Sequence, residues 1–296
     1  MKTHGKLAAV ILVFALCVLV PMGCGALGQG GRVLTLASMG WDENVALSNL
    51  TKVLFQDDLG YQRVDIVTQK TLGATYRGVA SGDLDAFQGV WLPNQQALLD
   101  EFAGEDVEHL DPWYMGETEQ GMAVPAYMDV NSIDQLNGTD TRLIYGIEGS
   151  SVVMHEVEKR VIPEYHLKQQ IVQGPTAGML YEVGRLYAYK EDFVFLAWSP
   201  HWMNQRYDIR YLKDPKDAMG PTNDPARLST IVRGGLREGD PEAYALMDAL
   251  ELDQGQIEGL EYAINNADDP VAGARRWVSE NRQVVGPYIE AARNAS

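Results

Sequence analysis

Short apolar runs alternate with amphipathic segments along most of this chain. Runs rich in Val, Ile, Leu and Phe predict strands at 33–37, 64–67, 85–90, 143–147, 170–172 and 193–198. Apolar residues at helical spacing predict helices at 43–59, 72–79, 93–102, 150–160 and 176–189. Because strands and helices alternate with short connections, the pattern predicts an α/β fold with mostly parallel sheet.

Two segments break this rhythm. Residues 121–127 are extended, contain a proline and lead into no helix, and residues 207–212 resemble a returning strand. The segment 227–293 is mainly amphipathic, which predicts helices. We therefore expect two α/β lobes joined by a hinge, with a ligand cleft at the carboxyl ends of the strands. The expected division is 32–123 with 204–296 for lobe I and 124–203 for lobe II.

The N-terminus predicts a signal peptide over residues 1–26. Lys2 and Lys6 precede an apolar run from Leu7 to Val20, which is shorter than the roughly 20 residues that a spanning helix needs. Gly23-Cys24 resembles the end of a bacterial lipoprotein leader, in which Cys24 would carry lipid, and ordinary cleavage near Ala26 is the alternative. Either way, we expect a protein that acts outside the cytoplasmic membrane, in the periplasm or on the outer face of that membrane.

Composition narrows the possible partners and cofactors. The chain of 296 residues has a formal net charge of −17, which disfavours binding to nucleic acid or anionic lipid. Both cysteines, Cys17 and Cys24, lie in the leader, so the body has neither a disulfide framework nor a thiolate metal site.

Several short motifs fail when their context is considered. The G-x-G-x-x-G run from Gly23 to Gly28 lies in the leader, and His155-Glu156 lacks the second histidine of a zinc site because Lys159 occupies its position. Ser150 and Ser151 are better interpreted as helix N-caps than as nucleophiles. His201 has no partner at ligand spacing, so a structural role is favoured. We expect no catalytic residues, no metal and no cofactor.

Three tryptophans stand out because each follows or ends a predicted strand. Trp198, in the run Phe193 to Trp202, would be ordinary core if taken alone, but Trp41 and Trp91 occupy equivalent places. Ligands bind at this edge of open α/β sheets, so the three rings predict an aromatic box. Such a box binds quaternary ammonium through cation–π attraction. A zwitterion would place its carboxylate on the helix N-terminus that follows Gly146 and Ile147.

The chain resembles the substrate-binding proteins of glycine betaine/choline-type ABC transporters, the osmoprotectant-uptake class. The resemblance covers the chain from Val33 to about Tyr288. It is carried by a series of short motifs at compatible spacing, namely Gly40-Trp41-Asp42-Glu43, Ala80-Ser81-Gly82-Asp83-Leu84-Asp85, Trp91-Leu92-Pro93-Asn94, Val124-Pro125-Ala126-Tyr127, Tyr145-Gly146-Ile147, Trp198-Ser199-Pro200-His201-Trp202 and Leu212-Lys213-Asp214-Pro215-Lys216.

This resemblance implies a type II periplasmic-binding-protein fold that closes over one betaine-like ligand. It implies a cage of Trp41, Trp91 and Trp198, with backbone N–H groups of Gly146 and Ile147 on the ligand carboxylate. Relatives often carry a histidine after the Trp-Leu-Pro motif, where this chain has Gln96 as the remaining hydrogen-bond donor. The implied partners are the membrane subunits of an ABC transporter, the implied state is a monomer, and no enzymatic activity is implied.

The sequence leaves the ligand open. Glycine betaine is the first expectation, and choline, carnitine, proline betaine, ectoine or a sulfonium analogue remain alternatives. A cationic amino acid or polyamine would need acidic partners in the cleft for its N–H donors. A secreted hydrolase on the same scaffold is the rival from a different class.

Overall fold

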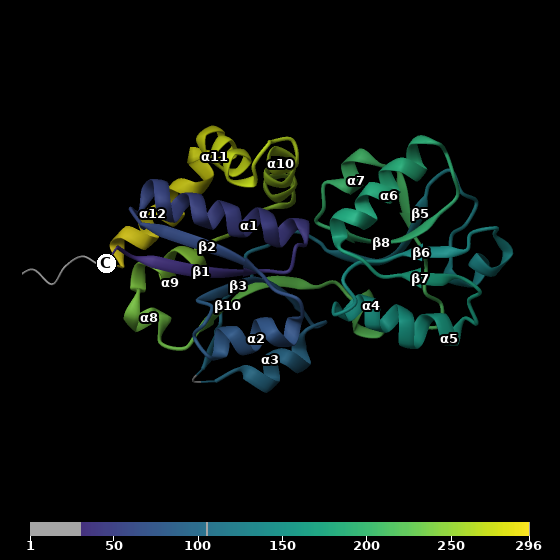
Figure 1. Ribbon diagram of the computed structural model, residues 1–296, viewed down its shortest axis with the longest axis horizontal. Coiled ribbons are helices and arrows are strands. Elements are labelled where there is room, and N and C mark those ends of the chain that lie inside the picture. Colours follow the sequence, from purple (N-terminus) through teal and green to yellow (C-terminus); the bar gives the residue numbers. More distant parts are fainter. Residues whose placement is uncertain (1–30, 105, 296) are drawn as a thin grey trace, which may run out of the picture. The chain divides into compact units, whose positions relative to one another are not determined.

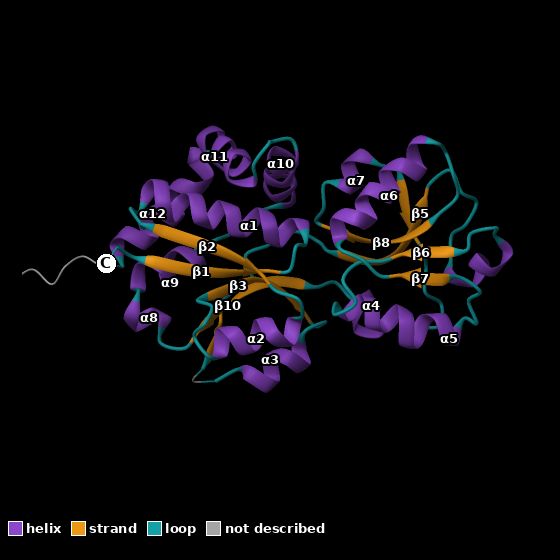
Figure 2. Cartoon of the chain, viewed as in Figure 1, coloured by secondary structure: helices purple, strands orange, loops and turns teal. Residues whose placement is uncertain are grey.

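The computed structural model describes residues 31–104 and 106–295. The predicted signal peptide, with Cys17 and Cys24, lies outside the described residues. Within the described part of the chain, the strands form two five-stranded sheets, each accompanied by helices (Figures 1 and 2). None of the helices described there is long and apolar enough to cross a membrane. The two predicted α/β lobes are confirmed.

The first sheet has the strand order β2-β1-β3-β10-β4. Strand β1 is parallel to β2 and β3, whereas β10 returns antiparallel between β3 and β4. The strands are β1 (Val33–Ser38), β2 (Arg63–Thr68), β3 (Ala86–Leu92), β4 (Val107–His109) and β10 (Arg227–Arg233).

Helices cover both faces of this sheet, with α1 on one face and α2 and α3 on the other (Figure 2). The helices of this first lobe are α1 (Asp42–Val53), α2 (Leu72–Ala80), α3 (Gln96–Phe102), α8 (Leu236–Gly239), α9 (Pro241–Asp248), α10 (Gln254–Asn265), α11 (Pro270–Glu280) and α12 (Arg282–Asn294). A π-helical turn, Leu54–Asp58, extends α1 to the predicted end of the helix near residue 59.

Helix α1 is buried on nearly all sides because α10 and α11 pack on it from outside the sheet. Its apolar residues Ala46, Leu47 and Leu50 are fully buried, but so are Asn44 and Ser48. Asn44 remains satisfied, since its side-chain oxygen accepts from the Met39 N–H at 2.9 Å and its amide donates to the hydroxyl of Ser48 at 3.4 Å. This burial holds the N-terminal turn of α1 in a fixed position beside the end of β1.

The second sheet has the strand order β7-β6-β8-β5-β9. Strand β6 is parallel to β7 and β8, and β5 is antiparallel to β8 and β9. Its elements are β5 (Glu119–Pro125), β6 (Leu143–Tyr145), β7 (Gln170–Val172), β8 (Val194–Ser199) and β9 (Ile209–Tyr211), with α4 (Val152–Glu156), α5 (Ile162–Glu164), α6 (Thr176–Ala188) and α7 (Met203–Arg206). A π-helical segment, Val157–Val161, joins α4 to α5.

Two features of the fold differ from the sequence-based expectation. The segment 227–233 is strand β10 rather than the start of the helical region, because its residues 228–232 are buried between β3 and β4. The segment predicted to cross between lobes, 121–127, lies largely in β5, which pairs with β8. The second sheet therefore uses residues from 119 to 211, beyond both ends of the expected 124–203.

Candidate ligand-binding site

One cavity has walls from both lobes, and the space free of protein atoms there is about 360 Å³ when the solvent at its mouth is included. From the first lobe come α1, α2 and the end of β3, and from the second come β5, β8 and the start of α4. The wall is formed by Trp41, Glu43, Leu72, Trp91, Asn94, Gln95, Gln120, Ile147, Ser151, Val152, Val153 and Trp198.

All three predicted tryptophans border this cavity. Trp41 directly precedes α1, Trp91 lies near the end of β3, and Trp198 lies near the end of β8. Their side chains are 6%, 4% and 3% exposed, respectively. Three strand ends that are far apart in the sequence thus deliver indole rings to one enclosed space.

Glu43 is the charged residue among the cavity residues that sequence reasoning missed, which also include Asn94 and Gln120. It lies in the first turn of α1 and is 1% exposed. Its carboxylate accepts one hydrogen bond from Trp91 Nε1 and one from Trp198 Nε1, each at 3.1 Å. A single side chain of the first lobe therefore orients two cage rings, one from each lobe. The available signal was its place two residues after Trp41, in the motif Gly-Trp-Asp-Glu.

Burial raises the pKa of Glu43 to about 7, and the neighbouring Asp42 contributes in the same direction. The two indole N–H groups oppose the rise because they stabilise the ionised form. The carboxyl group therefore changes charge near neutral pH.

Amide and hydroxyl groups complete the polar part of the wall. Asn94 donates to the side-chain oxygen of Gln120 at 2.6 Å, and Gln95 is held by Tyr76 Oη and the carbonyl of Gly89, each at 3.0 Å. Trp41 Nε1 and Asn94 Oδ1 are buried without a hydrogen-bond partner within the described chain. Buried polar atoms of this kind are normally satisfied, so their position on a cavity wall is typical of a ligand site.

Of the other predicted site residues, only one lies on the cavity wall. Ile147 lies on the cavity wall, but its N–H points to Met154 Sδ at 3.3 Å. The N–H of Gly146 donates to the carbonyl of Val172 at 2.9 Å, and Gly146 is not part of the wall. The structure does not bring Gln96 to the cavity either, since its amide donates to Asp100 on exposed surface at 2.7 Å.

Ser151 behaves as the predicted helix N-cap. Its hydroxyl oxygen accepts from the N–H of Met154 at 3.4 Å, and the residue is also part of the cavity wall. The helical segment that begins here runs from α4 through to α5 without a break. Its first turn, with Val152 and Val153, therefore faces the cavity.

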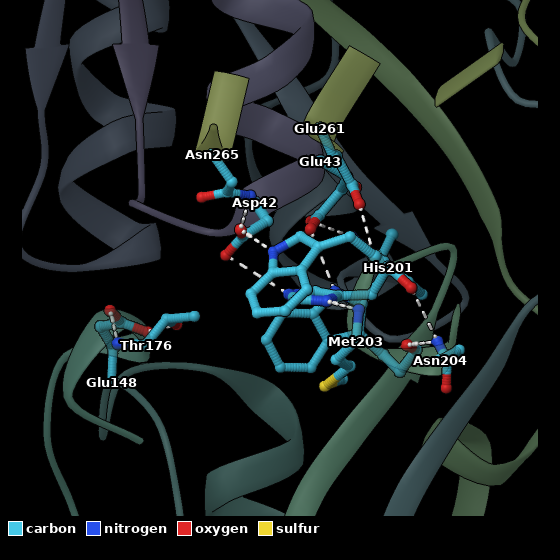
Figure 3. A network of polar contacts seen from close by, with 12 residues as sticks. Asp42, Glu43, Glu148, Thr176, His201, Met203, Asn204, Glu261 and Asn265 are labelled. Atoms are coloured by element: carbon cyan, nitrogen blue, oxygen red, sulfur yellow. Dashed lines mark hydrogen bonds and ion pairs between the residues drawn. The ribbon is translucent and has the colours of Figure 1, made fainter. Parts of the chain in front are cut away.

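A polar network next to the cage ties the Trp198–Trp202 segment to the first lobe (Figure 3). Trp202 donates through Nε1 to Asp42 at 2.6 Å and through its backbone N–H to Glu261 at 2.7 Å. His201 Nε2 lies 3.3 Å from Asp42, and its Nδ1 accepts from the N–H of Met203. This geometry confirms the structural role expected for His201.

The pKa values of two carboxyl groups in this network are shifted in opposite directions. Burial alone raises the pKa of Asp42, but the hydrogen bond and charge of His201, together with hydrogen bonds from Asn265 and Trp202, lower it below its ordinary value. Burial, together with the charges of Asp42 and Glu43, raises the pKa of Glu261 well above its ordinary value. Across the described residues, no group of three or more His, Cys, Asp or Glu side chains could hold a metal ion.

Two α/β lobes that share one buried, indole-lined cavity define a solute-binding protein. The sequence matches, over residues 32–280, the family described as the substrate binding domain of ABC-type glycine betaine transport systems. The chain belongs to this family, which comprises extracytoplasmic solute-binding proteins of ABC transporters and not enzymes.

Several known proteins are similar to this chain. One is lactococcal OpuAC, whose structure was solved in a closed conformation with glycine betaine. It is 30% identical in sequence to this chain and superposes with a TM-score of 0.76, over 87% of this chain and 99% of OpuAC. The glycine betaine/carnitine transport binding protein GbuC of Listeria monocytogenes is 29% identical over 160 residues, which is 53% of this chain and 51% of GbuC, so the match spans about half of that relative. A choline-binding protein solved with choline, 23% identical with a TM-score of 0.76, covers 89% of this chain and 94% of its own and shares the fold.

Proposed function

We propose that this protein captures a quaternary ammonium osmolyte in a cage of Trp41, Trp91 and Trp198 and delivers it to an ABC importer. The observation that carries the proposal is the convergence of three buried indoles on one cavity, two of them bonded to the same carboxylate.

The chemistry of the cage suits a methylated cation. A quaternary ammonium group donates no hydrogen bond, so aromatic ring faces are the appropriate wall for it. Each cation–π contact contributes about 0.5 kcal/mol when exposed and about 2 kcal/mol or more when desolvated. The near-complete burial of Trp41, Trp91 and Trp198 places their contacts towards the upper end of that range.

Glycine betaine remains the first candidate ligand. Its carboxylate would find donors in the amides of Asn94 and Gln120 and in the first turn of the helical segment at Ser151. These groups replace the Gly146 and Gln96 donors expected from the sequence. Choline, carnitine, proline betaine, ectoine and a sulfonium betaine are the competing ligands.

A primary ammonium ligand is the second candidate, because Glu43 places an acidic group in the cavity. Such a ligand needs several free acceptors for its N–H groups. Both oxygens of Glu43 already accept from the Trp91 and Trp198 indoles, which favours a methylated cation. Putrescine and arginine therefore belong in the ligand panel as negative controls.

The remaining parts of the proposal concern location and partners. Export through the signal peptide at residues 1–26, with or without lipid on Cys24, would place the monomer beside the membrane subunits of its importer. Mass spectrometry of the mature N-terminus from the native host distinguishes a lipidated Cys24 from cleavage near Ala26.

Calorimetric titration with this panel tests the binding function. Trp198→Ala should lose a cage contact of about 1–2 kcal/mol, which lowers the affinity for glycine betaine about tenfold. Trp277→Ala is the matched control, because Trp277 is a buried tryptophan of α11 outside the cavity. If the Trp41, Trp91 and Trp198 alanine variants all bind as tightly as wild type, the cage does not exist.

A further inference from the structure

Glu43 differs from the other residues of the cavity wall in its charge. The residues described on that wall include no Lys, Arg or His, so its carboxylate is the one group there that carries a formal charge. A polar wall that met only a ligand without a cationic group would not need a buried carboxyl group, because burying an unpaired charge is costly.

The surroundings of Glu43 do little to offset that cost. Asp42 from the same helix and Glu258 and Glu261 from α10 are acidic, and His201 is the basic side chain that the structure places in this region. His201 is paired with Asp42 rather than with Glu43. The Glu43 carboxylate is therefore stabilised by a hydrogen bond from its own backbone N–H and by the two indole N–H groups, with no cationic side chain paired to it.

We propose that Glu43 is the counter-charge of the cage and that ligand capture is coupled to loss of a proton from this residue. The proposal rests on the quaternary ammonium function proposed above and specifies how that site is regulated. A cation in the cavity favours the ionised carboxylate, so the carboxylate in turn favours the bound cation.

The hydrogen bonds from Trp91 and Trp198 to Glu43 also couple the protonation of this carboxyl group to the positions of the two rings. An ionised carboxylate has acceptor capacity for both indoles, whereas a protonated one also carries an O–H that needs an acceptor of its own. Protonation therefore weakens the attachment of one ring, Trp91 or Trp198. A charged acceptor also polarises the indole that donates to it, which increases the electron density of the ring face that meets the cation.

The direction of the pH dependence follows from burial, which raises the pKa of Glu43 to about 7 in the ligand-free protein. Above that pH the carboxylate is already ionised, and the affinity is at its full value. As the pH falls below about 7, the ligand must displace a proton, so the affinity falls by up to about tenfold per pH unit.

Calorimetry of the full mature chain with two ligands tests the coupling. Tetramethylammonium reports on the cage alone, and glycine betaine adds the carboxylate. Titration in two buffers with different ionisation enthalpies counts the protons released. We expect about 0.9 proton at pH 6 and close to none at pH 8.5, with the affinity about tenfold lower at pH 6.

Two variants identify the source of the proton. Glu43→Gln should bind both ligands with an affinity that does not change between pH 6 and pH 8.5 and should release no proton. Glu261→Gln removes a second buried carboxyl group of this region, which lies outside the cavity wall, and should release the proton as wild type does.

The outcomes separate the two proposals. If wild type binds neither ligand at pH 8.5, the proposed function fails. If wild type binds both ligands without proton release, or if Glu43→Gln still releases the proton, or if Glu261→Gln abolishes the release, the coupling to Glu43 is wrong while the binding function stands. Circular dichroism of each variant establishes that it is folded before titration.

Discussion

Replacing Glu43 by glutamine should stabilise the ligand-free protein at pH 8 and destabilise it at pH 4. The pKa of Glu43 rises from an ordinary value of 4.5 to about 7 in the folded state because burial disfavours its charge. The folded state therefore holds a proton that the unfolded state releases between these pH values. Stability from this group is fully present below pH 4.5 and is lost as the pH rises through 7.

The magnitude follows from the same two pKa values. Each pH unit between them corresponds to about 1.4 kcal/mol, so Glu43 lowers the free energy of unfolding by about 3 kcal/mol between pH 4.5 and pH 8. Glutamine carries no charge, but its single acceptor oxygen bonds one indole well and leaves the other weaker, at a cost of about 1 kcal/mol. Glu43→Gln should thus be more stable than wild type by about 2 kcal/mol at pH 8 and less stable by about 1 kcal/mol at pH 4, below both pKa values.

Urea unfolding of ligand-free wild type and Glu43→Gln at both pH values measures this crossover. A neutral substitution of an exposed acid, Glu101→Gln, serves as the control and should shift stability by less than about 0.5 kcal/mol at either pH. A stability difference for Glu43→Gln that is the same at pH 4 and pH 8 would refute the reasoning. So would a variant that is less stable than wild type at pH 8.

Three further predictions concern the scaffold, and urea unfolding measures each of them. Trp202→Phe removes the hydrogen bond to Asp42 and should cost about 1–3 kcal/mol, since the acceptor is charged; an unchanged free energy of unfolding would contradict the assigned contact. Phe195→Ala leaves a cavity in the buried centre of β8 and should cost about 3–5 kcal/mol, and a cost below 1 kcal/mol would contradict its core position. Arg275→Ala breaks an exposed ion pair with Asp57 and should cost less than about 1 kcal/mol, with a smaller effect at high salt.

The sequence was informative wherever a signal was local. Alternating strands and helices, and the two lobes they build, follow from periodicity and turn residues that each span only a few positions. The placement of Trp41, Trp91 and Trp198 at strand ends is also local. The parallel strands β1 and β3 bring the first two to one edge of the first sheet, whereas Trp198 comes from the second sheet.

Features that depend on pairing across the chain were not predictable in this way. Residues 227–233 form a strand because they pair with β3 on one side and β4 on the other. In the sequence, such a short apolar run cannot be distinguished from a segment of buried helix. Backbone N–H groups raise the same difficulty. The N–H of Gly146 is taken by Val172, and nothing in the sequence between those positions reveals the bond.

The tryptophan cage combines features that the sequence determined with features that only the tertiary structure decided. The sequence by itself determined that three indoles would stand at strand ends, because each position depends on its own strand. Only the tertiary structure decided that Glu43 lies between Trp91 and Trp198, since this contact requires α1, β3 and β8 to meet. The raised pKa of Glu43 also depends on the tertiary structure. Desolvation causes the rise, and the carboxyl group is desolvated only when both lobes surround it.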